Sequence, residues 1–334
     1  MLAFEPQPLP WQLAQWQQLI AQRQQQKLAH AYLLHGMPGV GKLHFAQLFG
    51  QLLLCLKPNL ETASPCQQCK SCLLFNASSH PDILQIVPEG SGKPIKVDQI
   101  RQLIDFVAKT AQQGGYRVII IDPADAMNIN ASNALLKCLE EPGRNTILLL
   151  LSERTSALLA TIKSRCQVLA FPLPALSVAK AWLQQQSLAD NDLDQLLVAA
   201  HYQPLTALTF HKNQRLKQRQ ALQSCLATIT KGQKTPVAAA QEWQNEDLLC
   251  LFDWLVDWLA EMIKWVMAKD ETFIKNHDML KMLNYVSSKA GVTRLYGYYA
   301  WLIEQRQRLL GAANQNKQLV LESLFIGWLH LTIY

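Results

Sequence analysis

The sequence predicts an α/β fold, in which a five-stranded parallel sheet carries a phosphate-binding loop and a metal-binding insert, followed by two all-helical domains. Five apolar runs alternate with segments of helical period over residues 31–171, as buried parallel strands and their crossover helices do. A glycine-rich loop follows the first run. Beyond Pro172 and Pro174 the pattern is helical to the end. We therefore expect domains at 1–172, 173–210 and 211–334, with the insert at about 55–72.

The five apolar runs give the expected strands: Ala31–Leu34, Asp82–Val87, Arg117–Ile121, Thr146–Leu151 and Gln167–Phe171. The helical segments around them are Trp11–Gln26, Phe45–Leu54, Val97–Val107, Asn128–Glu141 and Ser156–Lys163. Gly114-Gly115 is expected to end the third of these helices, and Pro142-Gly143 the fourth. About three short helices are expected in 175–210, and longer ones after Lys212.

The stretch Gly36–Leu43 reads GMPGVGKL and fits the phosphate-binding pattern G-x-x-x-x-G-K. Gly36, Gly39 and Gly41 allow close backbone approach, and amide groups at the start of the next helix favour anions. Lys42 is placed to reach terminal phosphates. The eighth position holds Leu43, where a working loop has a Ser or Thr that ligates magnesium. The loop is thus suited to hold phosphate and poorly equipped to use it.

Asp122 follows the third strand, at the sheet edge where nucleoside triphosphatases place a magnesium-coordinating Asp. The next residue is Pro123, although an ATPase with a D-E pair has Glu there to polarise water. Asp122 taken alone is equally consistent with a helix cap at the end of a strand. Together with the glycine-rich loop, it favours a nucleotide site.

Four of the eight cysteines lie close together in the sequence, at Cys55, Cys66, Cys69 and Cys72. Four thiolates form a complete tetrahedral set for structural zinc. An iron–sulfur cluster also uses C-x-x-C-x-x-C, but its usual fourth cysteine follows after three further residues and precedes a proline, and this chain has Asn76 at that position. Zinc is therefore favoured over a cluster and over four unliganded thiols. The remaining cysteines are expected to be small buried residues; they are Cys138, Cys166, Cys225 and Cys250.

The chain has 334 residues and a net charge of +6, which permits nucleic acid nearby without requiring it. Its beginning lacks the apolar core of a signal peptide. Leu248–Ala268 carries Asp253, Asp257, Glu261 and Lys264 on one stripe of a helix, so we expect an amphipathic bundle helix and not a membrane span. Its tryptophans at 254, 258 and 265 are expected in the core. These features predict a cytoplasmic protein without a membrane partner.

Several motifs resemble those of the bacterial clamp-loader ATPases of the AAA+ superfamily. They are GMPGVGK, the four-cysteine insert, HPD at His80–Asp82, ASNALLKCLEEPG at Ala131–Gly143 and SRC at Ser164–Cys166. Their order and spacing match from about His30 to Phe171, and the helical remainder matches in layout. The resemblance implies an AAA+ domain, a helical lid domain and a helical collar.

In the same family, the arginine of the SRC motif is the arginine finger, which enters the ATP site of a neighbouring subunit. The resemblance therefore assigns this role to Arg165. The sequence is compatible, because small residues flank Arg165 and no acidic residue is adjacent to it. The resemblance also implies that Ser152 senses phosphate, and that Leu205 stands where an active member has a sensing arginine.

Leu43, Pro123 and Leu205 are three departures from an active member, so the resemblance predicts a vestigial nucleotide site that does not hydrolyse ATP. Binding of ATP or ADP stays open, because Lys42 and the glycines are present. The implied partners are gamma/tau-type ATPase subunits and a delta subunit in a hetero-oligomeric ring, the sliding clamp, and primer–template DNA. The chain would then be a subunit of a DNA-directed DNA polymerase holoenzyme. The alternatives are an active gamma/tau-type ATPase and a stand-alone DNA-binding module.

Overall fold

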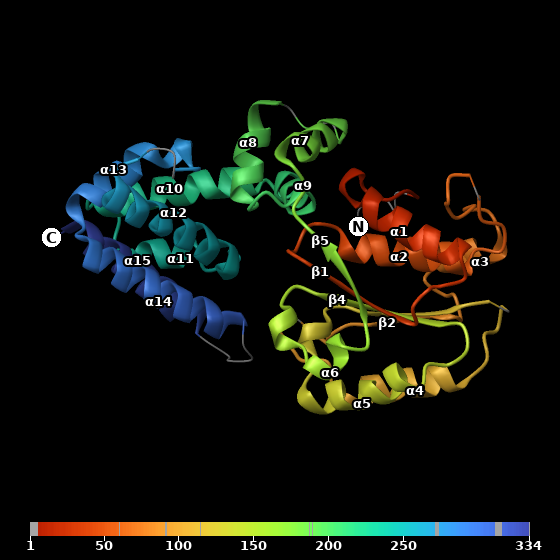
Figure 1. The fold of residues 1–334 in the computed structure, drawn as a ribbon. Helices are drawn as coiled ribbons and strands as arrows, with labels where there is room; N and C mark the ends of the chain where they lie inside the picture. Colours follow the sequence, from red (N-terminus) through yellow and green to blue (C-terminus); the bar gives the residue numbers. More distant parts are fainter. Residues whose placement is uncertain are drawn as a thin grey trace. The chain divides into compact units, whose positions relative to one another are not determined.

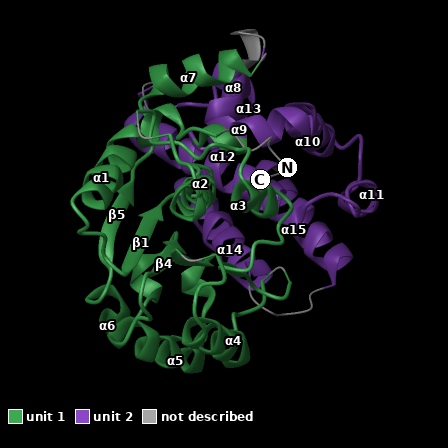
Figure 2. Ribbon diagram, turned by 90° about the vertical axis from the view of Figure 1, so that its right-hand side faces the viewer, with its two compact units in different colours: residues 1–186, 203–206 green, residues 187–202, 207–334 purple. Residues whose placement is uncertain are grey.

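The computed structural model describes residues 6–59, 61–90, 92–113, 115–186, 188, 190–270, 274–310 and 316–333. The chain divides into two compact units (Figure 2). The first contains residues 1–186 and 203–206, and the second contains residues 187–202 and 207–334. This division groups residues 173–186 with the sheet. The three-domain boundaries at 172 and 210 stay a prediction.

The first unit is built on a five-stranded parallel sheet with the strand order β2-β3-β4-β1-β5. Its strands are β1 (Ala31–Gly36), β2 (Ile83–Ile86), β3 (Arg117–Ile121), β4 (Thr146–Ser152) and β5 (Gln167–Phe171). All five predicted strands are present. Since β5 is an edge strand that pairs only with β1 in this order, the segment that leads into it lies at the border of the sheet.

Helices cover both faces of this sheet, as Figure 1 shows. On one face, α1 (Leu13–Gln24) and α2 (Lys42–Leu54) pack on side chains that alternate along the strands. On the other face, α4 (Val97–Ala108), α5 (Ile129–Glu140) and α6 (Ala160–Lys163) cover the residues between them. Because the sheet is buried on both faces, the inner strands β3 and β4 are buried along their whole length, and the third inner strand, β1, is buried over its first four residues.

Two of the predicted helices differ most from those in the structure. α4 ends at Ala108, well before the glycine pair expected to end it; Gly114 of that pair lies outside the described residues. The stretch expected as one helix near Ser156–Lys163 is a 3-10 turn, Thr155–Ala157, followed by the one-turn helix α6. The insert contributes α3 (Lys70–Asn76), and α7 (Leu176–Gln185) follows the sheet.

The second unit is helical in the part of the chain that the structure describes. Its helices are α8 (Asp190–Ala199), α10 (Arg215–Thr230), α11 (Pro236–Glu242), α12 (Leu248–Ala268), α13 (Leu280–Lys289), α14 (Val292–Leu310) and α15 (Lys317–Ile333). α9 (Pro204–Lys212) begins in the first unit and continues in the second. Within the described residues, no helix combines the length and the apolar character needed to cross a membrane.

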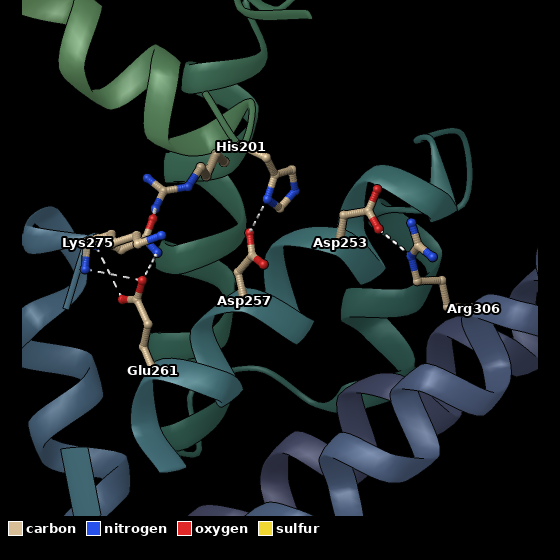
Figure 3. A network of polar contacts seen from close by, with 8 residues as sticks. His201, Asp253, Asp257, Glu261, Lys275 and Arg306 are labelled. Carbon is tan, nitrogen blue, oxygen red and sulfur yellow. Dashed lines mark hydrogen bonds and ion pairs between the residues drawn. The ribbon is translucent and has the colours of Figure 1, made fainter. Parts of the chain in front are cut away.

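α12 coincides with the predicted amphipathic helix. Trp254 and Trp258 are buried in the core of the second unit, and Trp265 packs against it, which confirms their expected core role. The three carboxylates on its polar side, Asp253, Asp257 and Glu261, form what we call the α12 stripe (Figure 3). Each accepts contacts from a different side chain or segment of the same unit, so the stripe is not simply a solvated face.

Candidate functional site

The phosphate-binding loop lies between the end of β1 and the start of α2, as the sequence predicts. Gly39 and Gly41 have φ values of +69° and +84°, a conformation that favours glycine. Gly41 is the N-cap of α2, so the first amides of the helix lack intrahelical partners. Gly36 instead allows β1 and β5 to lie close together, because a Cβ at this position would lie 2.2 Å from the carbonyl oxygen of Phe171 in β5.

Lys42 is folded back onto its own loop. Its Nζ donates to the carbonyl oxygens of Gly36 and Met37, each at 2.8 Å. Burial lowers the pKa of Lys42, while the nearby carboxylates of Glu153, Asp122 and Asp125 act in the opposite direction. The ammonium group that would meet terminal phosphates is therefore bonded to the loop carbonyls.

A cavity of about 620 Å³ opens beside the loop. The loop contributes Gly39, Gly41, Lys42 and Leu43 to its wall, and Leu205 lines it as well. Leu43 thus places an apolar side chain where a hydroxyl would ligate magnesium. Further lining residues come from the strand ends, the N-terminal segment, α2, α7 and the insert, and include Asp122, Glu153, Leu9, Gln47, Trp182, Gln67 and Asn76.

The structure brings Asp122 to this cavity but keeps Ser152 out of it. Burial raises the pKa of Asp122, and Lys42 opposes this shift. The N-cap of the following 3-10 turn, Ala124–Ala126, is Pro123 and not Asp122. Ser152 is fully buried at the end of β4 beside His35, and its Oγ has no hydrogen-bond partner among the described residues.

The carbonyl oxygens of the loop accept hydrogen bonds from the N-terminal segment and from Leu205. Gln12 Nε2 donates to the carbonyl oxygens of Val40 and Gly41 at 2.9 Å, and Trp11 Nε1 donates to Val40 at the same distance. The amide of Leu205 donates to the carbonyl oxygen of Gly39 at 3.1 Å. Nothing in the glutamine-rich N-terminal segment marks these two side chains, since their partners are backbone carbonyls.

The four cysteines of the insert form a compact cluster. The Sγ atoms of Cys55, Cys66, Cys69 and Cys72 all lie within 4.8 Å of one another. The Cys55–Cys69 and Cys66–Cys72 sulfur pairs are 3.9 and 4.0 Å apart. Tetrahedral thiolates at a Zn–S distance of about 2.3 Å would stand about 3.8 Å apart, so the residues fit a tetrahedral metal ion.

Backbone amides support thiolate ligands in this cluster. Amides of Cys66, Cys69 and Cys72 each donate to the sulfur of another cysteine at 3.3–3.4 Å. Burial acts against ionisation of Cys69, yet the amides of Cys72 and Leu56 and the thiols of Cys72 and Cys66 lower its pKa to about 6. Burial raises the pKa of Cys55 and of Cys72. The other four cysteines are all buried, as expected.

The HPD motif and the insert are joined by polar contacts. Ser71 donates to the carbonyl oxygen of Leu54 and bonds His80 Nε2 at 2.8 Å, and His80 Nδ1 accepts from the amide of Asp82. The buried Gln51 of α2 bonds Gln67 and Asn76 of the insert. The insert is thereby fixed to the helix that carries the phosphate-binding loop.

Arg165 has an acidic partner, although no acidic residue is adjacent in the sequence. Its Nη2 bonds Oε1 of Glu140 at 2.8 Å, and its Nη1 donates to the carbonyl oxygen of Thr161 at 3.0 Å. Glu140 is the last residue of α5 and the first glutamate of the LEEP sequence. The side chain of Arg165 is 36% exposed, and that of Glu140 is 52% exposed.

The sheet order, the loop and the helical remainder define a P-loop protein of the AAA+ class. A solved structure with this arrangement is that of a DNA polymerase III gamma subunit-related protein from Thermotoga maritima. It has a TM-score of 0.50 and 17% identity, and the match covers 96% of this chain and 99% of that chain. At this identity the likeness concerns the fold alone.

Sequence comparisons identify the family. The profile described as "DNA polymerase III, delta subunit" matches residues 11–175, and that of its C-terminal part matches residues 213–330. A DNA polymerase III subunit delta' from Pseudomonas aeruginosa is 41% identical over 96% of this chain and 97% of its own. The Haemophilus influenzae subunit delta' is 33% identical over 76% and 77%. The chain belongs to the family of DNA polymerase III delta' subunits, which confirms the resemblance drawn from its motifs.

Proposed function

We propose that this chain is a non-hydrolysing subunit of the DNA polymerase III clamp loader that donates Arg165 to the ATP site of a neighbouring subunit. In this proposal it forms a hetero-oligomeric ring with gamma/tau-type ATPase subunits and a delta subunit in the cytoplasm. The ring places the sliding clamp on primer–template DNA during replication.

The observation that carries the proposal is the position of Arg165 along the sheet. Gly36, where the phosphate-binding loop begins, is level with Phe171 at the carboxyl end of β5. β5 runs from Gln167 to Phe171, which is about 13 Å at about 3.3 Å per residue, and Arg165 lies in the turn two residues before this strand begins. Arg165 therefore lies at the opposite end of the sheet from its own loop, so that any phosphate it serves belongs to another chain.

The residues around this chain's own phosphate-binding loop support the proposal that it does not hydrolyse ATP. Leu43 cannot ligate magnesium, and Pro123 cannot polarise water. Lys42 is bonded to loop carbonyls, and two carboxylates, Asp122 and Glu153, line the same cavity. A nucleotide without its magnesium ion would meet these negative charges directly.

Arg165→Ala tests the finger. Arginine fingers contribute about three to five orders of magnitude to phosphoryl transfer, so turnover at the neighbouring site should be abolished while turnover at other sites of the ring persists. The assay is steady-state ATP hydrolysis by the ring assembled with gamma/tau and delta subunits, with assembly checked by size. Arg101→Ala is the matched control, since it removes an exposed arginine that pairs with Asp98 within α4. Unchanged turnover with Arg165→Ala in an assembled ring would refute the role.

We further propose that the four-cysteine cluster binds one structural zinc ion. The four thiolates would hold the metal, which would connect the end of α2 to α3 and make the insert rigid. Metal analysis of the purified, folded chain should give about one equivalent of zinc. Less than about half an equivalent would count against the proposal.

A catalytically active, gamma/tau-type ATPase is the second candidate, because the loop glycines, Lys42 and an open cavity are present. It predicts ATP turnover by the isolated chain that is lost with Lys42→Ala. A stand-alone DNA-binding module would instead show tight, salt-dependent DNA binding by the chain alone.

A further inference from the structure

The guanidinium of Arg165 is held from two directions by its own chain. Glu140 Oε1 accepts from Nη2 at 2.8 Å, and the carbonyl oxygen of Thr161 accepts from Nη1 at 3.0 Å. Thr161 belongs to α6, and Glu140 ends α5, which packs against α6. Contacts from these two helices thus fix the orientation of the guanidinium group.

The end of α5 is an unfavourable place for a carboxylate unless a cation is near. Helix C-termini carry partial negative charge, and here Glu140 is the last helical residue and Glu141 the C-cap. Arg165 supplies the compensating charge to Glu140 across the gap between α5 and the start of β5. In the described residues, Glu141 has no such ion pair.

The held guanidinium still offers hydrogen-bond donors to a partner. A guanidinium has five N–H groups, and the two contacts to Glu140 and Thr161 use two of them. The side chain stays partly exposed. Holding a flexible arginine in one orientation removes conformational freedom before the reaction, which is how a supporting residue assists a catalytic group.

We infer that Glu140 is a positioning residue for Arg165, orienting the guanidinium toward the phosphates of the neighbouring subunit. This inference depends on the proposed arginine-finger function. Glu140 does not touch the nucleotide in this scheme; it acts only through Arg165.

The quantity that tests it is the Arg165-dependent share of ring turnover, which is wild-type turnover minus that of the Arg165→Ala ring. Glu140→Ala should lower this share about two- to fivefold, the range expected from losing one partly exposed ion pair. Glu140→Gln keeps an acceptor oxygen and should lose less. The fall should appear in kcat while KM for ATP stays unchanged, because the finger acts on the transition state. Glu141→Ala is the matched control and should behave as wild type.

A double variant separates positioning from a general structural effect. In the Arg165→Ala background, Glu140→Ala should have no additional effect on turnover. An additional loss in that background, or a rise in turnover with Glu140→Ala alone, would overturn the inference. If Arg165→Ala lowers turnover but Glu140→Ala does not, only the positioning role is wrong. If Arg165→Ala has no effect, the proposed function itself fails. Thermal unfolding of each variant checks that the chain is folded.

Discussion

Glu261 of the α12 stripe should be a major determinant of the stability of the second unit. It is only 6% exposed, and its carboxylate accepts three hydrogen bonds. The donors are the backbone amides of Lys275 and Asn276, both at 3.2 Å, and Asn276 Nδ2 at 2.8 Å (Figure 3). One side chain therefore ties α12 to the segment that precedes α13.

Glu261→Ala leaves these three donors without their acceptor. A hydrogen bond to a charged group contributes about 1.5–3 kcal/mol. Two of the contacts are long, and water can partly replace them, so we expect a loss of about 3–5 kcal/mol in the free energy of unfolding. Glu261→Gln keeps the volume and one acceptor oxygen, and should lose about half as much.

Asp253→Ala is the matched control from the same stripe. Asp253 pairs with Arg306, and both side chains are about one-third exposed, so the expected loss is about 0–1 kcal/mol. Six of the nine tryptophans lie in this unit, and Trp254, Trp258 and Trp328 are buried in its core, so urea unfolding followed by tryptophan fluorescence reports mainly on it. If Glu261→Ala costs no more than Asp253→Ala, the anchoring role of the buried carboxylate is wrong.

Three further outcomes follow from the geometry. Gly36→Ala should destabilise the sheet by about 1–3 kcal/mol in urea unfolding, because its Cβ meets the β5 backbone, whereas Gly115→Ala, with nothing within 4 Å, should not. Burial raises the pKa of Asp257 from 3.8 to about 6, so the folded state binds its proton more tightly, and the contribution of this group to stability decreases as pH rises from about 4 to 6. Asp257→Asn should therefore gain stability over wild type across that interval in thermal scans, and a constant difference would contradict this. A strong chelator should lower the melting temperature of the chain, and zinc should restore it while magnesium should not.

Most of the sheet was predictable because its strands are apolar on both faces and are separated by crossover helices. Arg117–Ile121 and Gln167–Phe171 have the predicted bounds, and α12 begins and ends where its pattern does. The ends of the helices were harder to predict than the strands. α4 ends at Ala108, although no glycine or proline stands there, since a helix end depends on tertiary contacts as well as on local sequence.

The sequence pattern gives no reason to distinguish the carboxylates of the α12 stripe, but their surroundings in the structure differ. Position on a helix predicts which side chains share a face, but not what another segment brings to that face. Asp253 meets an arginine from α14, whereas Glu261 is buried under backbone amides near α13. Burial of one carboxylate among three is therefore a tertiary property.

Arg165 and Glu140 show where the prediction of the site stopped. Both belong to motifs that the sequence marks, LEEP and SRC, yet they are separated by 25 residues and the sequence alone does not pair them. The topology of the sheet brings Arg165 and Glu140 together. α5 runs back along the sheet from the carboxyl ends of the strands, and α6 precedes β5 at the opposite end. The end of α5 and the start of β5 must then lie at the same border, on the side away from the phosphate-binding loop. Two motifs that look independent in the sequence thus meet as an ion pair, at the border of the sheet opposite this chain's own phosphate-binding loop.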